Sequence, residues 1–223
     1  EIHLSTTLST NVLVENKQEH TGVIVSAGPG IHPAHFYIGD YYETVDGALD
    51  HRGVETKALD EEQLTDVIQT FSEEGIKVFA AVTKFSPRNP EHENTIARTL
   101  NGCSDFVTVG HTLSGSLNFP RRISTSYFNS SVWRRYTRFI DAMKRSLDEL
   151  GITAPVRILK ADGGTMPISY SRQYPVQTVL SGPAASVMGA LGLNRLQEDA
   201  VILDIGGTTT DMAVFARGVP LLE

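Results

Sequence analysis

The stretch 204-DIGGTTTD-211 lies between two apolar runs, 200-AVILDI-205 and 212-MAVFA-216. These runs predict two neighbouring β-strands. The Gly206-Gly207 pair between them predicts the turn of a β-hairpin, because glycine readily adopts the positive φ angles of tight turns. An ordinary structural hairpin would explain the glycines. It would not explain three consecutive threonines, which add more hydroxyl groups than a plain turn needs.

The residues of this turn favour binding of a nucleotide phosphate. Backbone N–H groups come close to a phosphate where glycine has no Cβ, and successive amides form an anion-binding concavity. We therefore predict phosphate contacts from Gly206, Gly207 and Thr208, and we assign Thr209 and Thr210 to the same loop. The stretch is not a Walker A loop, which ends in Gly-Lys-Ser/Thr and leads into a helix.

Two aspartates, Asp204 and Asp211, bracket the turn. Carboxylates beside a phosphate are repulsive unless a cation lies between them, and Mg²⁺ accepts one or two carboxylates together with phosphate oxygens. The pattern predicts a Mg²⁺–nucleotide site with two catalytic aspartates. Asp204 orients a Mg²⁺-bound or attacking water, and Asp211 supports the loop or the outer shell of the metal. The spacing also allows the two roles to be exchanged.

The rest of the chain predicts an α/β fold. Apolar runs at 76–82 and 105–110 read as strands, and helical spacing with caps or stops appears from Asp60 to Gly75 and over 124–150. Such alternation is typical of a largely parallel sheet. Residues 31–58 lack clear periodicity, so we expect a long loop or insertion there, with room for a short hairpin.

Composition narrows the classes of function. The chain has 223 residues and a net charge of −7, and its basic residues are scattered, so we expect no nucleic-acid partner. No apolar run approaches the roughly 18 residues of a membrane span, and no signal peptide opens the chain. The single cysteine, Cys103, excludes a disulfide framework. We therefore expect a soluble, cytoplasmic protein without a membrane partner.

Three further stretches precede the hairpin in a fixed order: 3-HLSTTLSTNVLVENK-17, 158-ILKADGGTMPI-168 and 175-PVQTVLSGPAASVMGALG-192. Together with 201-VILDIGGTTTDMAVFARGVP-220, they resemble the hydantoinase/oxoprolinase family, and specifically its A-type subunit. The resemblance implies an actin-like ATPase (ribonuclease H-like) core. It consists of a mostly parallel sheet with flanking helices, and its second domain is incomplete here.

The resemblance also implies an activity. Family members are ATP-dependent hydrolases that open cyclic amides of the hydantoin or 5-oxoproline type, with ATP and Mg²⁺ as cofactors and a B-type subunit or domain as partner. One alternative is a subunit of an ATP-dependent ketone carboxylase of the same family. Others from different classes are a non-catalytic actin-like nucleotide-binding module and an interaction domain without a ligand.

The resemblance further predicts how the chain is divided. Complete family members begin with another glycine-threonine-aspartate hairpin ahead of the segment at 3–17. We therefore expect residues 1–195 to form a first domain without its amino-terminal phosphate hairpin, and residues 196–223 to open a second domain. On this interpretation the chain alone is inactive, and bare hairpin edges favour a homo-oligomer.

Two glycine-containing turns are secondary candidates for substrate or hinge residues. Asp162, Gly163 and Gly164 follow a predicted strand, where open α/β sheets usually hold ligand groups. A simple turn fits these residues equally well. Ser181 and Gly182 begin a helix whose N–H groups and dipole favour an anion. Close helix packing or an interdomain hinge is the alternative at this position.

Overall fold

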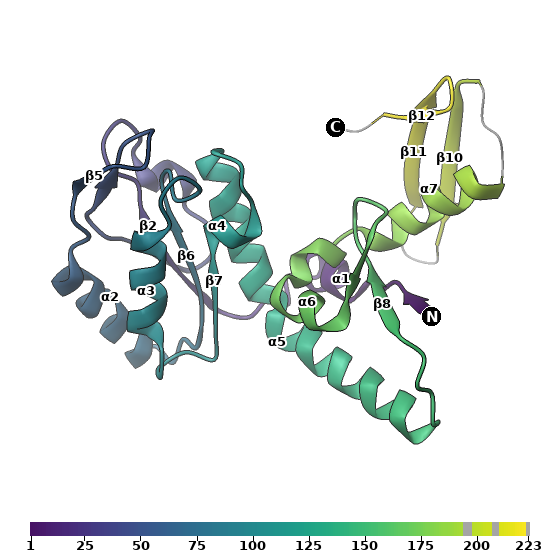
Figure 1. The fold of residues 1–223 in the computed structure, drawn as a ribbon, viewed down its shortest axis with the longest axis horizontal. Coiled ribbons are helices and arrows are strands. Elements are labelled where there is room, and N and C mark those ends of the chain that lie inside the picture. Colours follow the sequence, from purple (N-terminus) through teal and green to yellow (C-terminus); the bar gives the residue numbers. More distant parts are fainter. Residues whose placement is uncertain (194–197, 207–209, 222–223) are drawn as a thin grey trace. The chain divides into compact units, whose positions relative to one another are not determined.

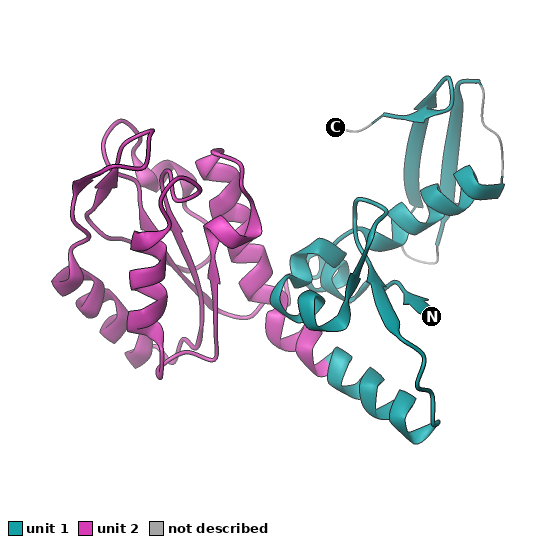
Figure 2. Ribbon diagram, in the orientation of Figure 1, with its two compact units in different colours: residues 1–15, 139–223 teal, residues 16–138 magenta. Residues whose placement is uncertain are grey.

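The computed structural model describes residues 1–193, 198–206 and 210–221 (Figure 1). The chain forms two compact units: unit 1 contains residues 1–15 and 139–223, and unit 2 contains residues 16–138 (Figure 2). Unit 2 is therefore inserted into the sequence of unit 1. The expected domain boundary at 195/196 lies outside the described residues and stays a prediction.

Unit 2 is built on a parallel four-stranded sheet within the described residues. Its strands, in spatial order, are β3 (Tyr41–Thr44), β2 (Thr21–Ser26), β6 (Val78–Thr83) and β7 (Phe106–Val109). Every residue of β2 and β6 is buried. Central strands of a parallel sheet are covered on both faces, which explains why these two strands are continuous apolar runs rather than alternating ones.

Helices cover both faces of this sheet. Ile24 of β2 packs with α2 (Glu61–Glu73) and α3 (Glu91–Leu100) in one apolar cluster. Its neighbours Val23 and Val25 pack with Phe119 and Ile123 of α5 (Phe119–Glu149) in a second cluster. Because successive side chains of a strand point to opposite faces, the two clusters lie on opposite sides of the sheet. The result is a helix–sheet–helix sandwich.

Residues 31–58 are more ordered than the sequence predicts. They contain the short 3₁₀ helix η1 (Pro33–Phe36), strand β3, and a hairpin of β4 (Ala48–Leu49) and β5 (Glu55–Lys57). The hairpin confirms part of the expectation, whereas a loop at β3 is wrong. β3 was missed because it lies at the edge of the sheet, where only Tyr42 of its residues is buried and no apolar pattern develops.

The predicted helix boundaries are largely confirmed. The Asp60 carboxylate accepts a hydrogen bond from the Gln63 backbone N–H at 3.0 Å and caps α2. The Gln63 side chain accepts from the Asp46 N–H at 2.7 Å and so anchors the start of α2 to the preceding segment. The longest helix begins at Phe119 rather than 124, because Asn118 accepts from the Arg121 N–H and caps it there.

The chain enters and leaves unit 2 at one place. The Glu19 N–H donates to the Ser131 carbonyl oxygen at 3.0 Å, and the Arg134 guanidinium contacts the Glu19 carboxylate at 2.6 Å. Arg134 also binds Asp105 at 2.6 Å. Next to this clasp the only tryptophan of the sequence, Trp133, stacks on Phe106 with ring centroids 4.7 Å apart.

Unit 1 contains a small mixed sheet, a set of helices and a terminal hairpin. In the sheet, β1 (Ile2–Leu4) pairs parallel with β8 (Val156–Leu159), and β9 (Thr165–Pro167) pairs antiparallel with β8. The other elements of unit 1 are α1 (Leu8–Val14), α6 (Ile168–Gln173), η2 (Pro175–Thr178), α7 (Ser181–Leu193), β10 (Ala200–Ile205), β11 (Thr210–Ala216) and β12 (Val219–Pro220). Within the described ranges, no helix combines the length and apolarity needed to cross a bilayer.

Candidate functional site

The predicted hairpin is present as strands β10 and β11. They pair antiparallel, with Asp204 directly opposite Asp211 and Ile205 opposite Thr210. Gly206 and Thr210 at the base of the turn are exposed. Gly207, Thr208 and Thr209, which belong to the predicted phosphate loop, lie outside the described residues.

The hairpin has one half-buried and one exposed face. Asp204 and Asp211 share the half-buried face, which lies against α7. Between hairpin and helix is a hollow of about 20 Å³, lined by Pro183, Ser186 and Val187 of α7 and by both aspartates among other residues. A space of this size holds about one water molecule. The opposite face exposes the apolar side chains of Val201, Leu203, Ile205 and Met212.

Asp204 has a specific partner on α7. The Ser186 hydroxyl donates a hydrogen bond to Asp204 Oδ2 at 2.5 Å. This contact holds the carboxylate in one orientation beside the hollow. Sequence reasoning missed Ser186, because it considered 181-SGPAAS-186 only as a helix terminus and not as a neighbour of the hairpin.

The two aspartates suit a magnesium ion. Like charges directly opposite on antiparallel strands repel each other, and a cation near both carboxylates removes that repulsion. Mg²⁺ prefers oxygen ligands, keeps much of its water and needs only one or two protein carboxylates. Among the described residues, no three or more histidine, cysteine, aspartate or glutamate side chains come together to hold a metal ion. A magnesium ion at the two aspartates would therefore take its other ligands from substrate and water.

The Asp162–Gly164 turn joins β8 to β9 and contacts α7. Asp162 accepts hydrogen bonds from Lys160 Nζ at 2.7 Å and from the Gly164 N–H at 2.8 Å. These bonds, the one from Lys160 foremost, lower the pKa of Asp162. Gly163 has a φ of +80°, and a Cβ there would lie 3.0 Å from Met188 Cγ of α7. The contacts fit a structural turn, and the role of these residues toward substrate stays a prediction.

The amino end of α7 lies against the first residues of the chain. Ser181 is fully buried, and its hydroxyl donates to the Thr6 carbonyl oxygen at 3.2 Å. A Cβ on Gly182 would lie 3.5 Å from Thr7 Cγ2, and the Leu180 N–H donates to Thr10 Oγ1 at 2.9 Å. These contacts support close packing at this helix end. The substrate or hinge role of Ser181 and Gly182 stays a prediction.

Helix α7 thus brings together stretches that are far apart in the sequence. The segment at 3–17 contacts its first turn, the turn after β8 contacts it at Met188, and the hairpin contacts it at Ser186. One helix therefore aligns every motif that the sequence analysis singled out for chemistry. Propensity and spacing alone do not predict this arrangement.

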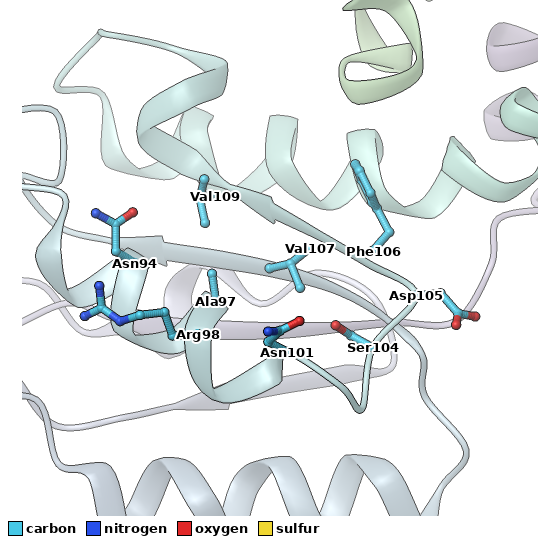
Figure 3. A pocket seen from close by; sticks show the side chains of 9 residues that line it. All are labelled: Asn94, Ala97, Arg98, Asn101, Ser104, Asp105, Phe106, Val107 and Val109. Carbon is cyan, nitrogen blue, oxygen red and sulfur yellow. The ribbon is translucent and has the colours of Figure 1, made fainter. Parts of the chain in front are cut away.

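A wider hollow of about 640 Å³ lies in unit 2, along the edge strand β7 (Figure 3). Its polar side chains do not converge on a common point. Arg98 is held by Glu91 and Thr95, and Asp105 is held by Arg134. Phe106 extends away from Asn101 and Ser104 toward the opposite side of the strand (Figure 3). We interpret this hollow as an open groove rather than a chemical site.

The fold identifies the structural class of the chain. The structure of acetone carboxylase in its nucleotide-free form, described in work on ATP-dependent acetone carboxylation, matches 97% of this chain and 35% of its own, with a TM-score of 0.82 at 18% identity. The structure of the ATP-dependent caprolactamase from Pseudomonas jessenii matches 94% of this chain and 34% of its own, with a TM-score of 0.77 at 25% identity. The chain therefore has the actin-like ATPase fold, as predicted.

Sequence comparison identifies the family. The model for the hydantoinase/oxoprolinase N-terminal region matches residues 1–103, and the model described as hydantoinase/oxoprolinase matches residues 122–223. The chain belongs to the hydantoinase/oxoprolinase family.

Curated relatives agree with this assignment. The caprolactamase subunit alpha of Pseudomonas jessenii is 29% identical over 194 residues, which is 83% of this chain and 27% of the relative. The 5-oxoprolinase 1 of Arabidopsis thaliana is 26% identical over 256 aligned positions, covering 95% of this chain and 20% of the relative. The chain thus spans about a fifth to a quarter of the length of these two relatives.

Proposed function

We propose that this chain is the nucleotide-handling part of an ATP-dependent hydrolase that opens a cyclic amide of the hydantoin or 5-oxoproline type. The observation that carries the proposal is the pairing of Asp204 with Asp211 at the base of the glycine-threonine turn, with Ser186 holding Asp204. Family membership and relatives named as a caprolactamase and a 5-oxoprolinase support the cyclic-amide substrate.

In this mechanism the chain binds and orients the phosphate groups of ATP. Backbone N–H groups from Gly206 to Thr208 hold the phosphate, and the threonine hydroxyls add hydrogen-bond donors. Asp204, fixed by Ser186, orients the attacking or metal-bound water, and Asp211 supports the loop. Bound Mg²⁺ would neutralise the charge that develops on the phosphate oxygens. Transfer of the γ-phosphoryl group of ATP to the amide oxygen would break its bond to ADP, and the carbonyl carbon of the phosphorylated ring would then be a better electrophile for water.

The proposal extends to a partner and a compartment. A B-type subunit or domain would complete the enzyme, which is supported by the description of the Pseudomonas relative as a subunit alpha. We place the protein in the cytoplasm, where ATP is supplied. A homo-oligomer is proposed from the exposed apolar face and the open edges of the terminal hairpin.

A second candidate function is a subunit of an ATP-dependent ketone carboxylase. The structural similarity to acetone carboxylase favours it, although at 18% identity that similarity supports the fold alone. Both functions use the same phosphate hairpin. The two functions differ in the compound that stimulates ATP hydrolysis: a cyclic amide for the hydrolase and a ketone for the carboxylase.

The test uses the full-length gene product together with its partner subunit. We expect ATP hydrolysis that a cyclic amide stimulates, and a decrease of about 100-fold or more in Asp204→Asn. Gly207→Val should weaken ATP binding, because a side chain would block the approach of phosphate. Asp199→Asn is the matched control, since Asp199 lies beside the other end of the hairpin, where it accepts from the Arg217 N–H.

Three results would decide against the proposal. Stimulation by a ketone with bicarbonate, but by no cyclic amide, would support the carboxylase instead. Equal ATPase rates for Asp204→Asn and the control would remove the hairpin from the mechanism. ATP affinity unchanged by Gly207→Val would exclude the phosphate contact.

A further inference from the structure

Unit 2 contains a second candidate site, in a hollow of about 360 Å³ at the carboxyl ends of β2 and β3. One wall is the loop after β2 (residues 27–29), and the other is the segment 44–48 with Lys57. Open parallel sheets hold ligands outside the carboxyl ends of their strands. The volume lies within the range of about 300–1,000 Å³ that is typical of small-molecule sites.

The walls of this hollow are fixed by contacts to neighbouring elements. On the far side of the β4–β5 hairpin, Glu55 contacts the buried His92 of α3 at 2.7 Å, and the Gly53 carbonyl oxygen accepts from Asn89 at 2.9 Å. Tyr42 donates to the carbonyl oxygen of Pro33, another lining residue, at 2.9 Å. A ligand would therefore enter a hollow that is already formed.

An acceptor and a donor lie side by side in the lining. Asp46 Oδ2 and Lys57 Nζ are 2.9 Å apart. The Asp46 backbone is itself anchored by its hydrogen bond to Gln63 Oε1 at 2.7 Å. Asp46 has a second carboxylate oxygen, and Lys57 has further N–H donors, so both can also bind a ligand. The rest of the lining is mixed: Thr44 and the glycine backbone are polar, and Pro29 and Pro33 provide apolar surface, because Ala27 and Val45 are almost fully buried.

We propose that this hollow binds a cyclic amide. A ring forces the amide to be cis, so its N–H and C=O lie on the same edge. Asp46 accepts from that N–H, Lys57 donates to that C=O, and Pro29 and Pro33 contact the ring methylenes. The choice of a cyclic amide among molecules with this donor–acceptor edge rests on the proposed function. The position of the site rests only on the contacts of unit 2.

The test measures lactam binding by saturation-transfer NMR on the full-length gene product, with no nucleotide present. The probes are caprolactam, N-methylcaprolactam (which has no N–H) and 6-aminohexanoate (the hydrolysed, zwitterionic form). We expect caprolactam to bind. N-methylcaprolactam and the variants Lys57→Met and Asp46→Asn should each weaken the interaction about tenfold, the effect of one lost hydrogen bond to a charged group.

Lys77→Met is the matched control, because Lys77 precedes β6 at the amino ends of the parallel strands, away from the hollow, where it donates to the Cys103 carbonyl oxygen. Circular dichroism confirms that each variant is folded. Caprolactam affinity that is unchanged in Lys57→Met and Asp46→Asn would overturn the site. Tighter binding of 6-aminohexanoate than of caprolactam would overturn the cyclic-amide assignment.

The test also separates this inference from the proposed function. Suppose that a cyclic amide stimulates ATP hydrolysis, that this needs Asp204 but not Lys57, and that no lactam binds in the hollow. These results would refute the hollow alone. If Lys57→Met weakens lactam binding as expected but the protein never hydrolyses ATP, the proposed function alone is refuted.

Discussion

Replacing Glu93 by glutamine should strongly destabilise unit 2. Glu93 lies on α3 and is completely buried. One carboxylate oxygen accepts from the Thr83 N–H at 2.8 Å. The other accepts from the His111 N–H at 2.8 Å and contacts His111 Nδ1 at 2.6 Å. Glu93 therefore ties α3 to the ends of both β6 and β7.

The magnitude follows from what the substitution leaves behind. A glutamine keeps one acceptor oxygen but places an NH₂ group against a buried N–H donor, which costs about 1–3 kcal/mol. It also removes the negative charge of Glu93 from the neighbourhood of the buried Arg122. Desolvation lowers the pKa of Arg122, and the charge of Glu93 raises it. Glu93 and Arg122 interact through space rather than as an ion pair, so this second term is smaller than the roughly 3–5 kcal/mol of a broken buried pair. We expect a total loss of about 2–4 kcal/mol.

Urea unfolding measures this loss, with Trp133 fluorescence as the signal. Trp133 is the only tryptophan of the sequence and lies in unit 2, so its signal reports on this unit. Glu91→Gln is the matched control on the same helix, because Glu91 is 58% exposed and its pairing with Arg98 is a surface ion pair, which adds little to stability. A loss for Glu93→Gln no larger than that of the control would refute the reasoning.

Two further substitutions test other contacts. Burial raises the pKa of Tyr42 from 10.0 to about 12. The contribution of the protonated Tyr42 to folding stability is therefore complete below pH 10 and is lost as the pH rises toward 12. Tyr42→Phe should therefore unfold at higher pH than the parent protein in an alkaline titration followed by circular dichroism; equal midpoints would contradict this. Gly163→Ala should destabilise unit 1 by about 1 kcal/mol more than Gly151→Ala in calorimetry. Both glycines have positive φ, but only Gly163 faces a neighbour, Met188, so equal losses would exclude that contact.

Much of the fold could be predicted because its signals are local. The buried strands β2 and β6 are continuous apolar runs, and Asp60 caps the helix that it precedes. The terminal hairpin follows from two apolar segments around a glycine pair. In each case the residues that determine the element lie within it or beside it. Propensity, capping and turn geometry were therefore sufficient.

The remaining features depend on tertiary contacts, which local patterns do not contain. Ser186 meets Asp204 only because α7 packs on the hairpin, and its sequence context predicts no such partner. Glu93 looks like a solvent-exposed residue of a polar helix, yet the ends of two strands surround it. Asp46 and Lys57 lie in a region that lacks periodicity, so nothing in the sequence suggested that they line one hollow.

The clasp between Glu19 and Arg134 has a consequence for how the protein assembles during synthesis. β1 emerges early from the ribosome, but its partner β8 is made only after all of unit 2, since Ile2 pairs with Val156. Closing so long a loop costs conformational entropy that grows with the logarithm of its length. Folding of residues 16–138 joins the two ends of the insertion through Glu19 and Arg134, so the effective loop becomes much shorter. We therefore expect residues 16–138 to fold first, and β1 to pair with β8 only afterwards.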